Sequence, residues 1–307
     1  MITYVDFSLF ESPAKVLVNT VNTVGVMGKG IAKGFKRIFP EMFAEYQLLC
    51  ENGQFNTGDL WLYKSQHKWI LNFPTKKHWR HPSKPEYVEA GLQKFVTVHQ
   101  DARITSISFP MLGCGNGELD WKTQVRPLME RYLRQLPIQV FIHITGTQPS
   151  FIPEHLDPES TKRWLRNEPR SMAFTEFWGD LAAVIEKTPT LVTLDRKEQF
   201  TAELKTEGDQ QVHLITTDES VHLHQEQFLD LWQQIRDVGL CIPQIMPGGL
   251  DRYGRYVLPL LAKLPYLWPI RQADKDTQMS RTALGLLYKF HPVEEDPEST
   301  PKQLQLV

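Results

Sequence analysis

Apolar and polar positions alternate along the first half of the chain with two spacings, one typical of strands and one typical of helices. Short apolar runs predict strands at Ile2–Phe7, Val16–Val18, Asp59–Tyr63, Trp69–Phe73, Ile104–Phe109 and Ile138–Ile144. Amphipathic blocks between them predict helices at Gly30–Phe39, Glu41–Glu51, Pro85–Val98 and Lys122–Leu136. Strands separated by helices indicate an α/β domain over residues 1–148, in which helices flank a mixed sheet.

The alternation stops after residue 148. Four prolines lie between Thr147 and Pro169, where few apolar positions recur with a regular period. Because proline interrupts secondary structure, this composition predicts a linker over residues 149–170.

A second and smaller pattern follows the expected linker. Short strands are predicted at Leu191–Leu194, Phe200–Leu204 and Val212–Thr216, and a helix at Gln225–Val238. Three prolines exclude one long helix over Val257–Ile270. We therefore expect a smaller α+β domain over residues 171–291, followed by a disordered acidic tail over residues 292–307.

Length and composition agree with two globular domains. The chain has 307 residues, of which 41% are apolar and 23% are charged. No apolar run approaches the ~20 residues of a membrane span, and the first residues enter a strand pattern without the features of a signal peptide. We therefore expect a cytoplasmic protein with no membrane partner.

The net charge of −2 conceals a difference between the two halves. Residues 1–150 hold 17 Lys and Arg against 12 Asp and Glu, whereas residues 151–307 hold 17 against 24. A basic first half suits a substrate rich in phosphate. The acidic second half is either an ordinary solvated surface or a surface for a basic partner.

Two glycine-rich loops follow predicted strands. We call Asn19–Ala32 the first glycine loop and Pro110–Gly117 the second glycine loop. Residues without Cβ let backbone N–H groups approach a phosphate closely, so two such loops suggest a diphosphate held from both sides. Neither loop has the glycine spacing of a plain dinucleotide fold or the Gly-Lys-Ser/Thr of a P-loop, so both classes are disfavoured.

A basic segment, Asn72–His81, leaves the fourth predicted strand, and we call it the lysine loop. Pro74 ends the strand, which places Lys76, Lys77 and Arg80 at the rim of the sheet. Like charges and desolvation lower the pKa of a lysine and supply the free amine that attacks an electrophilic carbon. The alternatives are a solvated basic turn, or a surface on which Trp79 stacks with bases of single-stranded nucleic acid.

Other polar residues near these loops permit two interpretations. Cys114 lies inside the second glycine loop, but no Cys-His-Asp grouping accompanies it, so a packed thiol is favoured over a nucleophile. Asn19 and Asn22 follow the second predicted strand, where an amide suits either a sugar hydroxyl or a turn.

The two glycine loops and the lysine loop, in this order, resemble the macrodomains, and more narrowly those of the DarG antitoxins. The resemblance covers about residues 1–148. It implies a macrodomain fold that binds ADP-ribose and removes it from thymidine in single-stranded DNA, reversing the action of a DarT toxin. It implies neither a metal nor a cofactor.

The resemblance also implies a role for individual residues. Lys76 matches the catalytic lysine, which would attack the anomeric carbon of the distal ribose and form a transient Schiff base. Asn22 matches the residue at the distal ribose, and the two glycine loops match the phosphate loops. The ADP-ribose contacts implied in this way are Ser8, Leu9, Thr20, Val21, Asn22, Gly28, Lys29, Gly30, Ile31, Ala32, Thr75, Gly113, Cys114, Gly115, Asn116 and Gly117.

Two positions depart from the pattern of related families. Glycohydrolases acting on protein have an aspartate just after the second loop, where this chain has Gly117, followed by Glu118 and Asp120. The general base is therefore not assigned, and either acid suits a helix cap. Many macrodomains hold adenine with an aspartate where this chain has Ser8.

Residues 151–307 resemble the DarG antitoxins only in following a macrodomain and being acidic. In that family the C-terminal region sequesters the toxin, which implies a DarT-like ADP-ribosyltransferase as a partner of this chain. Carboxylates imitate phosphates for a basic DNA-binding groove. Two alternatives for the whole chain are a non-catalytic ADP-ribose reader and a glycohydrolase that acts on ADP-ribosylated protein acids.

Overall fold

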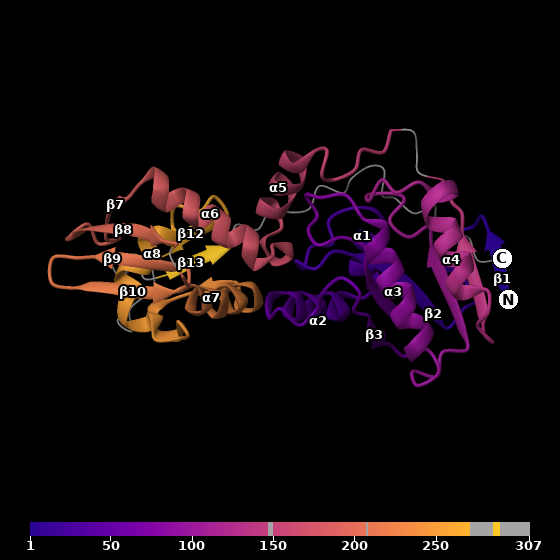
Figure 1. Ribbon diagram of the computed structural model, residues 1–307. Helices are drawn as coiled ribbons and strands as arrows, with labels where there is room; N and C mark the ends of the chain where they lie inside the picture. The colour runs from indigo at the N-terminus through magenta and orange to yellow at the C-terminus, as the bar shows by residue number, and fades with distance from the viewer. Residues whose placement is uncertain (147–149, 207, 271–284, 289–307) are drawn as a thin grey trace, which may run out of the picture. The chain divides into compact units, whose positions relative to one another are not determined.

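The computed structural model describes residues 1–146, 150–206, 208–270 and 285–288 (Figure 1). The chain divides into two compact units. The first unit comprises residues 1–165 and 171–179, and the second comprises residues 166–170 and the described residues from Asp180 onward. The expected disordered tail, residues 292–307, lies outside the described residues.

A six-stranded mixed sheet forms the centre of the first unit, as the sequence predicted. Its strands are β1 (Ile2–Val5), β2 (Val16–Val21), β3 (Trp61–Lys64), β4 (Trp69–Pro74), β5 (Ser106–Pro110) and β6 (Gln139–His143). The spatial order is β1-β6-β5-β2-β4-β3, and β3 alone is antiparallel to its neighbour. The pairing of Val18 with Leu71 fixes the register of the two central strands.

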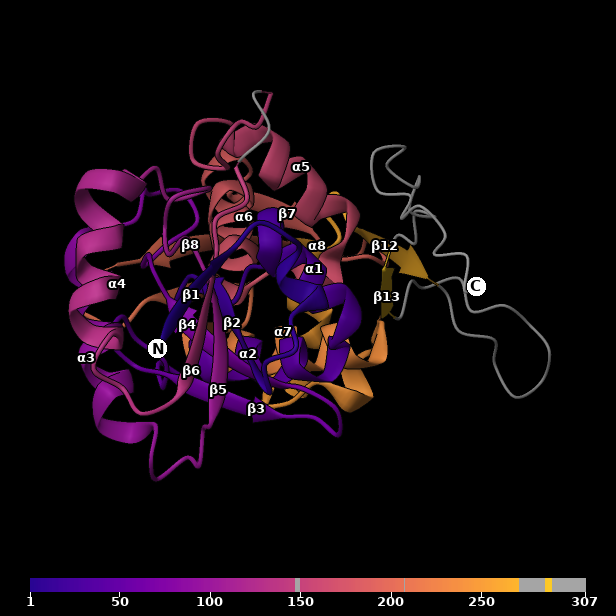
Figure 2. The ribbon, with the colours of Figure 1, turned by 90° about the vertical axis from the view of Figure 1, so that its right-hand side faces the viewer.

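Helices cover both faces of this sheet (Figure 2). The helices are α1 (Gly30–Ile38), α2 (Pro40–Glu51), α3 (Pro85–Val98) and α4 (Arg126–Leu133). Side chains alternate along β2, so Val18 packs with α3 and α4 in one core and Leu17 packs with α1 and α2 in another. This burial on both faces explains the continuous apolar runs in the sequence.

Five parallel strands end at one edge of the sheet. Their last residues are Val5 of β1, Val21 of β2, Pro74 of β4, Pro110 of β5 and His143 of β6. The two glycine loops and the lysine loop leave β2, β5 and β4 at this edge. Open α/β sheets bind ligands outside the carboxyl ends of their strands, so the fold brings the three predicted loops together.

The segment expected to be a linker is structured. Residues 150–165 belong to the first unit, and helix α5 (Pro158–Asn167) begins within them. The first unit therefore extends beyond residue 148. Pro158 does not prevent helix α5, because it occupies the first position of the helix, where a missing N–H group costs nothing. Helix α6 (Phe174–Lys187) follows and was not predicted. The helix predicted over Lys122–Leu136 begins as a single π-helical turn at Trp121–Val125 before α4.

The second unit is α+β, as the sequence predicted. One antiparallel sheet has the order β10-β9-β8-β7, formed by Ser220–His224, Gln211–Ile215, Gln199–Lys205 and Thr190–Val192. A second sheet has the order β11-β13-β12, formed by Leu240–Cys241, Gly285–Tyr288 and Leu267–Ile270. Its longer helices are α7 (Gln225–Val238) and α8 (Gly254–Leu261).

Two details of the second unit bear on the predictions. Gly239 ends α7 with a φ of 76°, the left-handed conformation that favours glycine. Val257–Ile270 is a helix followed by a strand, so one long helix is indeed excluded. Across the described residues of both units, none of the helices has the length and hydropathy needed to span a bilayer.

Candidate active site

A cavity of about 250 Å³ opens at the edge of the sheet where the parallel strands end. Both glycine loops and the lysine loop contribute to its lining. The predicted site residues that line it are Thr20, Val21, Asn22, Gly28, Lys29, Gly30, Ile31, Ala32, Thr75, Lys76, Gly113, Gly115, Asn116 and Gly117. Residues up to 97 positions apart in the sequence therefore meet at one cavity in the first unit.

Three predicted ligand residues are not in this lining. Ser8 is exposed, and its Oγ accepts a hydrogen bond from the backbone N–H of Phe10 at the start of a short 3₁₀ turn. Leu9 is buried in the core beside α1 and α2. Cys114 packs against the opposite core, and burial raises the pKa of its thiol to about 12. Their contacts with ADP-ribose therefore stay predictions, and the protonated thiol disfavours Cys114 as a nucleophile.

Asn22 organises the first glycine loop. Its Nδ2 donates to the backbone oxygen of Val26 at 2.7 Å, and its Oδ1 accepts from the backbone N–H of Val24 at 3.0 Å. Tyr46 donates its hydroxyl to both oxygens of Asn22. The side chain therefore serves as a turn former at the wall of the cavity, which is one of the two roles considered for it.

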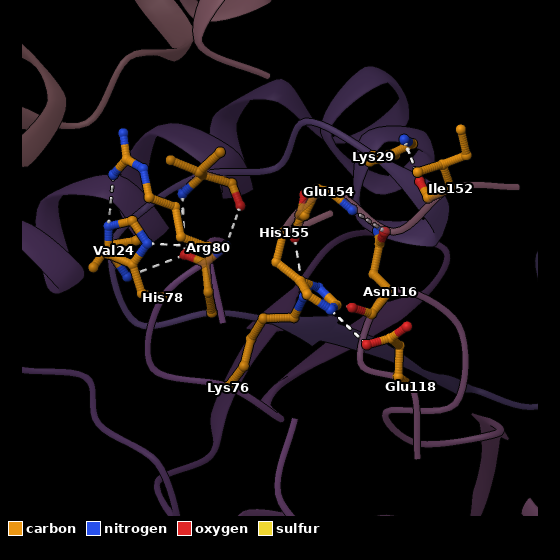
Figure 3. Close-up of polar contacts among 12 residues, drawn as sticks. Val24, Lys29, Lys76, His78, Arg80, Asn116, Glu118, Ile152, Glu154 and His155 are labelled. Carbon is orange, nitrogen blue, oxygen red and sulfur yellow. Dashed lines mark hydrogen bonds and ion pairs between the residues drawn. The ribbon is translucent and has the colours of Figure 1, made fainter. Parts of the chain in front are cut away.

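The first glycine loop leads directly into helix α1. Lys29 precedes the helix and provides no side-chain cap, so the backbone N–H groups of the first turn keep their capacity for an anion. Gly30 has a φ of 59°, which brings the backbone round the cavity. The ammonium group of Lys29 donates to the backbone oxygen of Ile152, so this basic side chain holds the chain beyond β6 (Figure 3).

The second glycine loop is closely packed around Ser83. The backbone N–H of Ser83 donates to the oxygen of Gly117 at 3.0 Å. A Cβ atom at Gly117 would lie 2.1 Å from Oγ of Ser83 and 2.4 Å from the backbone oxygen of Gly113. No side chain fits at Gly117 in this backbone, so the aspartate found there in related families is excluded sterically.

Lys76 is the central basic group of the cavity. Its side chain projects from the end of β4, and only 5% of the residue is exposed. Its Nζ donates to the backbone oxygen of Asn116 at 2.9 Å and to Oε1 of Glu154 at 3.1 Å. Burial lowers the pKa of Lys76, and the charge of Glu154 opposes this shift in part. A buried amine with a lowered pKa is suited to nucleophilic attack.

Lys77 and His81 of the lysine loop are exposed, whereas Trp79 and Arg80 contact other parts of the first unit. Trp79 is fully buried and donates its ring N–H to Glu176 at 3.1 Å, so it is not available to stack on a base. The guanidinium of Arg80 binds both oxygens of the same carboxylate and lies 4.1 Å from the centroid of the Trp79 ring. The idea that Trp79 contacts single-stranded nucleic acid is therefore wrong.

Several lining residues were not predicted from the sequence: Val26, Pro110, Met111, His143, Thr145, Gly146, Phe151 and Glu154. Three of them, His143, Thr145 and Gly146, lie at or just after the end of β6, and the rule that sheets bind ligands at this edge was sufficient to find them. Phe151 and Glu154 belong to the segment that was expected to be a linker. No sequence pattern marked them.

The two acids after the second glycine loop have other partners. Glu118 accepts a hydrogen bond from the ring of His155 at 2.6 Å (Figure 3). Asp120 accepts from the backbone N–H and the hydroxyl of Thr123 at 2.6 Å, which caps the helical turn that follows. The capping role considered for these acids is thus confirmed for Asp120.

Groups of three or more His, Cys, Asp and Glu side chains placed to hold a metal ion are absent from the described residues. The polar groups of the cavity include the amines of Lys29 and Lys76, the carboxylate of Glu154, and the backbone N–H groups of two loops. This set suits an organic ligand with a diphosphate and an electrophilic carbon.

The first half of the chain is similar in sequence to known proteins. Residues 18–128 match the family model of the Macro domain. A DNA ADP-ribosyl glycohydrolase of Thermus aquaticus is 44% identical over 169 residues, which cover 52% of this chain and 47% of the relative. A DNA ADP-ribosyl transferase-DNA ADP-ribosyl glycohydrolase fusion protein of Thermosipho africanus is 36% identical over 162 residues, which cover 47% of this chain and 42% of the relative.

A solved structure matches the first unit by sequence. The macrodomain of Mycobacterium tuberculosis DarG is 44% identical, and the alignment covers 48% of this chain and 99% of that structure, with a TM-score of 0.46. The chain spans less than half the length of the two curated relatives described above. The first unit therefore contains a macrodomain, as the match of residues 18–128 to the Macro domain family shows.

Proposed function

We propose that the first unit binds ADP-ribose and hydrolyses it from thymidine in single-stranded DNA. The observation that carries this proposal is the position of a buried lysine between two glycine loops at one cavity. The relatives named DNA ADP-ribosyl glycohydrolase, similar to this chain over its first half, support ADP-ribosylated DNA as the class of substrate.

The two glycine loops would hold the diphosphate. Backbone N–H groups at the start of α1 and in the second glycine loop present partial positive charge without a side chain in the way. The anion would sit beside Gly30 and Asn116, whose side-chain nitrogen lies 3.2 Å from the position of a Cβ on Gly30. Holding the diphosphate still would present the distal ribose to Lys76 at an attacking distance.

Lys76 would act as the nucleophile. Its amine nitrogen forms a bond to C1 of the distal ribose while the bond from C1 to the thymine nitrogen breaks, and the electron pair leaves with the base, which takes a proton. The sugar adduct opens to a Schiff base between C1 and Lys76. Water then adds to C1, the bond to the amine breaks, and ADP-ribose is released, so one water is consumed for each bond cleaved.

We propose a second role for the second unit: it binds and neutralises a DNA ADP-ribosyltransferase of the DarT kind. Residues 166–170 and 180–307 hold 20 Asp and Glu against 15 Lys and Arg, and this acidic excess suits a basic groove that binds DNA. A relative of the first half of the chain is named as a fusion of such a transferase with a glycohydrolase, which supports a functional link between the two activities.

Substrate choice tests the first role. The full chain is incubated with equal concentrations of a thymidine-ADP-ribosylated oligonucleotide and a glutamate-ADP-ribosylated peptide, and free ADP-ribose is measured. We expect rapid release from the oligonucleotide alone. Release from the peptide alone would assign the chain to protein substrates, and binding of ADP-ribose without release from either would make it a reader.

Co-purification tests the second role. The full chain and a shorter chain ending at Lys187 are each mixed with the transferase at low and at high salt. We expect the full chain alone to retain the transferase, and less of it at high salt, because screening weakens contacts between exposed charges. Equal retention by the shorter chain would contradict the assignment of this role to the second unit.

A further inference from the structure

The chain beyond β6 brings a carboxylate into the cavity. Glu154 is 5% exposed, and its Oε1 accepts a hydrogen bond from Nζ of Lys76 at 3.1 Å. The backbone N–H of Glu154 donates to Oδ1 of Asn116 at 3.2 Å, which ties the residue to the second glycine loop (Figure 3). The carboxylate is therefore fixed beside the lysine by contacts on both sides.

The other acids near the second glycine loop are not placed to exchange a proton with Lys76. Glu118 is bonded to His155, and Asp120 caps a helical turn. Gly117 has no space for the aspartate of related families. Among the carboxylates described around this cavity, Glu154 is the one in direct contact with the amine.

Burial moves the pKa values of the two groups toward each other. Desolvation lowers the pKa of Lys76 and raises the pKa of Glu154, because a charge is costly in a buried site. Their mutual attraction opposes both shifts. The direction of these shifts makes proton exchange between the two groups less costly than between an exposed lysine and an exposed glutamate, and general acid–base catalysis benefits from a smaller pKa difference.

We propose that Glu154 is the proton-transfer residue of the reaction at Lys76, an inference that rests on the proposed glycohydrolase function. The geometry that supports it is the 3.1 Å contact between Oε1 and Nζ of two buried side chains at the cavity. Glu154 thus replaces, from a different segment of the chain, the acid that cannot be accommodated at Gly117.

In one reaction cycle Glu154 accepts a proton twice and donates a proton twice. It first takes a proton from the ammonium of Lys76, which frees the amine, and passes this proton to the thymine nitrogen as the bond to C1 breaks. In the second half it takes a proton from the water that adds to C1. It then returns this proton to the nitrogen of Lys76 as the amine leaves, so both residues end as they began.

The pH dependence of the unmodified chain is the first test. Single-turnover release of ADP-ribose from a thymidine-modified oligonucleotide is measured between pH 5 and pH 10. A pair that works with one shared proton gives a bell-shaped profile, because the rate falls when the pair holds two protons or none. A rate that rises to a plateau and stays there at alkaline pH would overturn the proposal, since a lysine acting alone needs only to be deprotonated.

The substitution Glu154→Gln is the second test, because the amide keeps the size and the acceptor oxygen but cannot carry the proton. We expect the rate to fall by about 100-fold or more and the alkaline fall in rate to disappear. The matched control is Glu159→Gln in the same segment, where the side chain is 72% exposed. Its rate should equal that of the parent.

Labelling of Lys76 separates proton transfer from simple support of the lysine. The rate at which acetic anhydride modifies Lys76 is measured by mass spectrometry of the full chain at neutral pH. Glu154→Gln removes the charge that stabilises the ammonium, so we expect faster labelling together with slower release of ADP-ribose. Release by Glu154→Gln at the parent's rate, or slower release without faster labelling, would overturn the proposal.

Failure of this inference differs from failure of the proposed function. If the parent chain releases no ADP-ribose from the oligonucleotide, the glycohydrolase function is contradicted, and the role of Glu154 falls with it. If the parent releases ADP-ribose and Glu154→Gln does so equally fast, only the role of Glu154 is contradicted. Where Glu154→Gln does not fold, which its thermal unfolding would reveal, the bell-shaped profile of the parent decides alone.

Discussion

Nζ of Lys76 lies 3.1 Å from Oε1 of Glu154, although 78 positions separate the two residues. Lys76 follows β4 inside the region that matches the Macro domain family, whereas Glu154 lies beyond the end of that match at residue 128. The cavity is thus completed by a segment outside the residues that match the Macro domain family model. This relationship determines where the chain can be shortened and which side chains can be altered.

Shortening the chain tests the importance of the segment directly. A chain ending at residue 148 lacks Glu154 and Trp164, whereas a chain ending at Lys187 keeps both and completes helix α6. We expect the shorter chain to release ADP-ribose at least about 100-fold more slowly, the size of a lost acid–base group. Release assays on the two chains provide the measurement, and equal rates would contradict a role for residues 149–187.

Gly117→Ala should damage the second glycine loop. The added Cβ would lie 2.1 Å from Oγ of Ser83, so either that side chain or the loop must move. We expect a loss of about 1–3 kcal/mol in the free energy of unfolding and weaker binding of ADP-ribose, measured by urea unfolding and calorimetry. Gly179→Ala is the control, because nothing lies within 4 Å of its Cβ position. A stable Gly117→Ala variant that binds normally would contradict the described packing.

Gly28 and Trp164 should behave as a coupled pair. A Cβ at Gly28 would lie 2.8 Å from the ring of Trp164, and the ammonium of Lys36 lies 4.6 Å from the centroid of this ring. We expect Gly28→Ala to weaken ADP-ribose binding and Trp164→Leu to restore part of it in the double variant. Calorimetry on all four chains measures the coupling, for which about 0.5–3 kcal/mol is typical of touching residues. Strictly additive effects would contradict this contact.

His78 should make the chain less stable in acid. Burial, together with the nearby charges of Arg80, His81 and Lys76, lowers the pKa of His78 to about 4. An unfolded chain binds this proton near pH 6.5, so the free energy of unfolding falls as the pH drops from about 6.5 toward 4, by up to about 1.4 kcal/mol per pH unit. Urea unfolding of the parent and His78→Gln over this range should show a shallower dependence in the variant. A parent His78 that titrates near pH 6.5 by NMR would contradict the prediction.

The fold of the first unit was predictable because burial on both faces of a parallel sheet produces unmistakable apolar runs. Helix α6 also carried a signal, since Phe177, Leu181 and Ile185 recur at helical spacing, but it was not recognised. Strand β10 was missed because it has only two apolar positions, Val221 and Leu223, among polar neighbours. A period is difficult to establish from two residues.

The candidate site was predictable only where a motif follows a strand. Lys76 and both glycine loops were found in this way, and the structure places them at one cavity. Glu154 was not found, because its position depends on hydrogen bonds to Asn116 and Lys76 that no local pattern encodes. The steric exclusion of a side chain at Gly117 likewise depends on Ser83, which is distant in sequence.

The proposed glycohydrolase mechanism depends most on the amine of Lys76 forming a bond to the sugar. The direct measurement is trapping: the full chain is mixed with a thymidine-ADP-ribosylated oligonucleotide in the presence of cyanoborohydride, and its peptides are examined by mass spectrometry. We predict a reduced ADP-ribose adduct on Lys76, and neither adduct nor release of ADP-ribose with a folded Lys76→Ala variant. Release by Lys76→Ala at the parent's rate, with no adduct on the parent, would contradict the account.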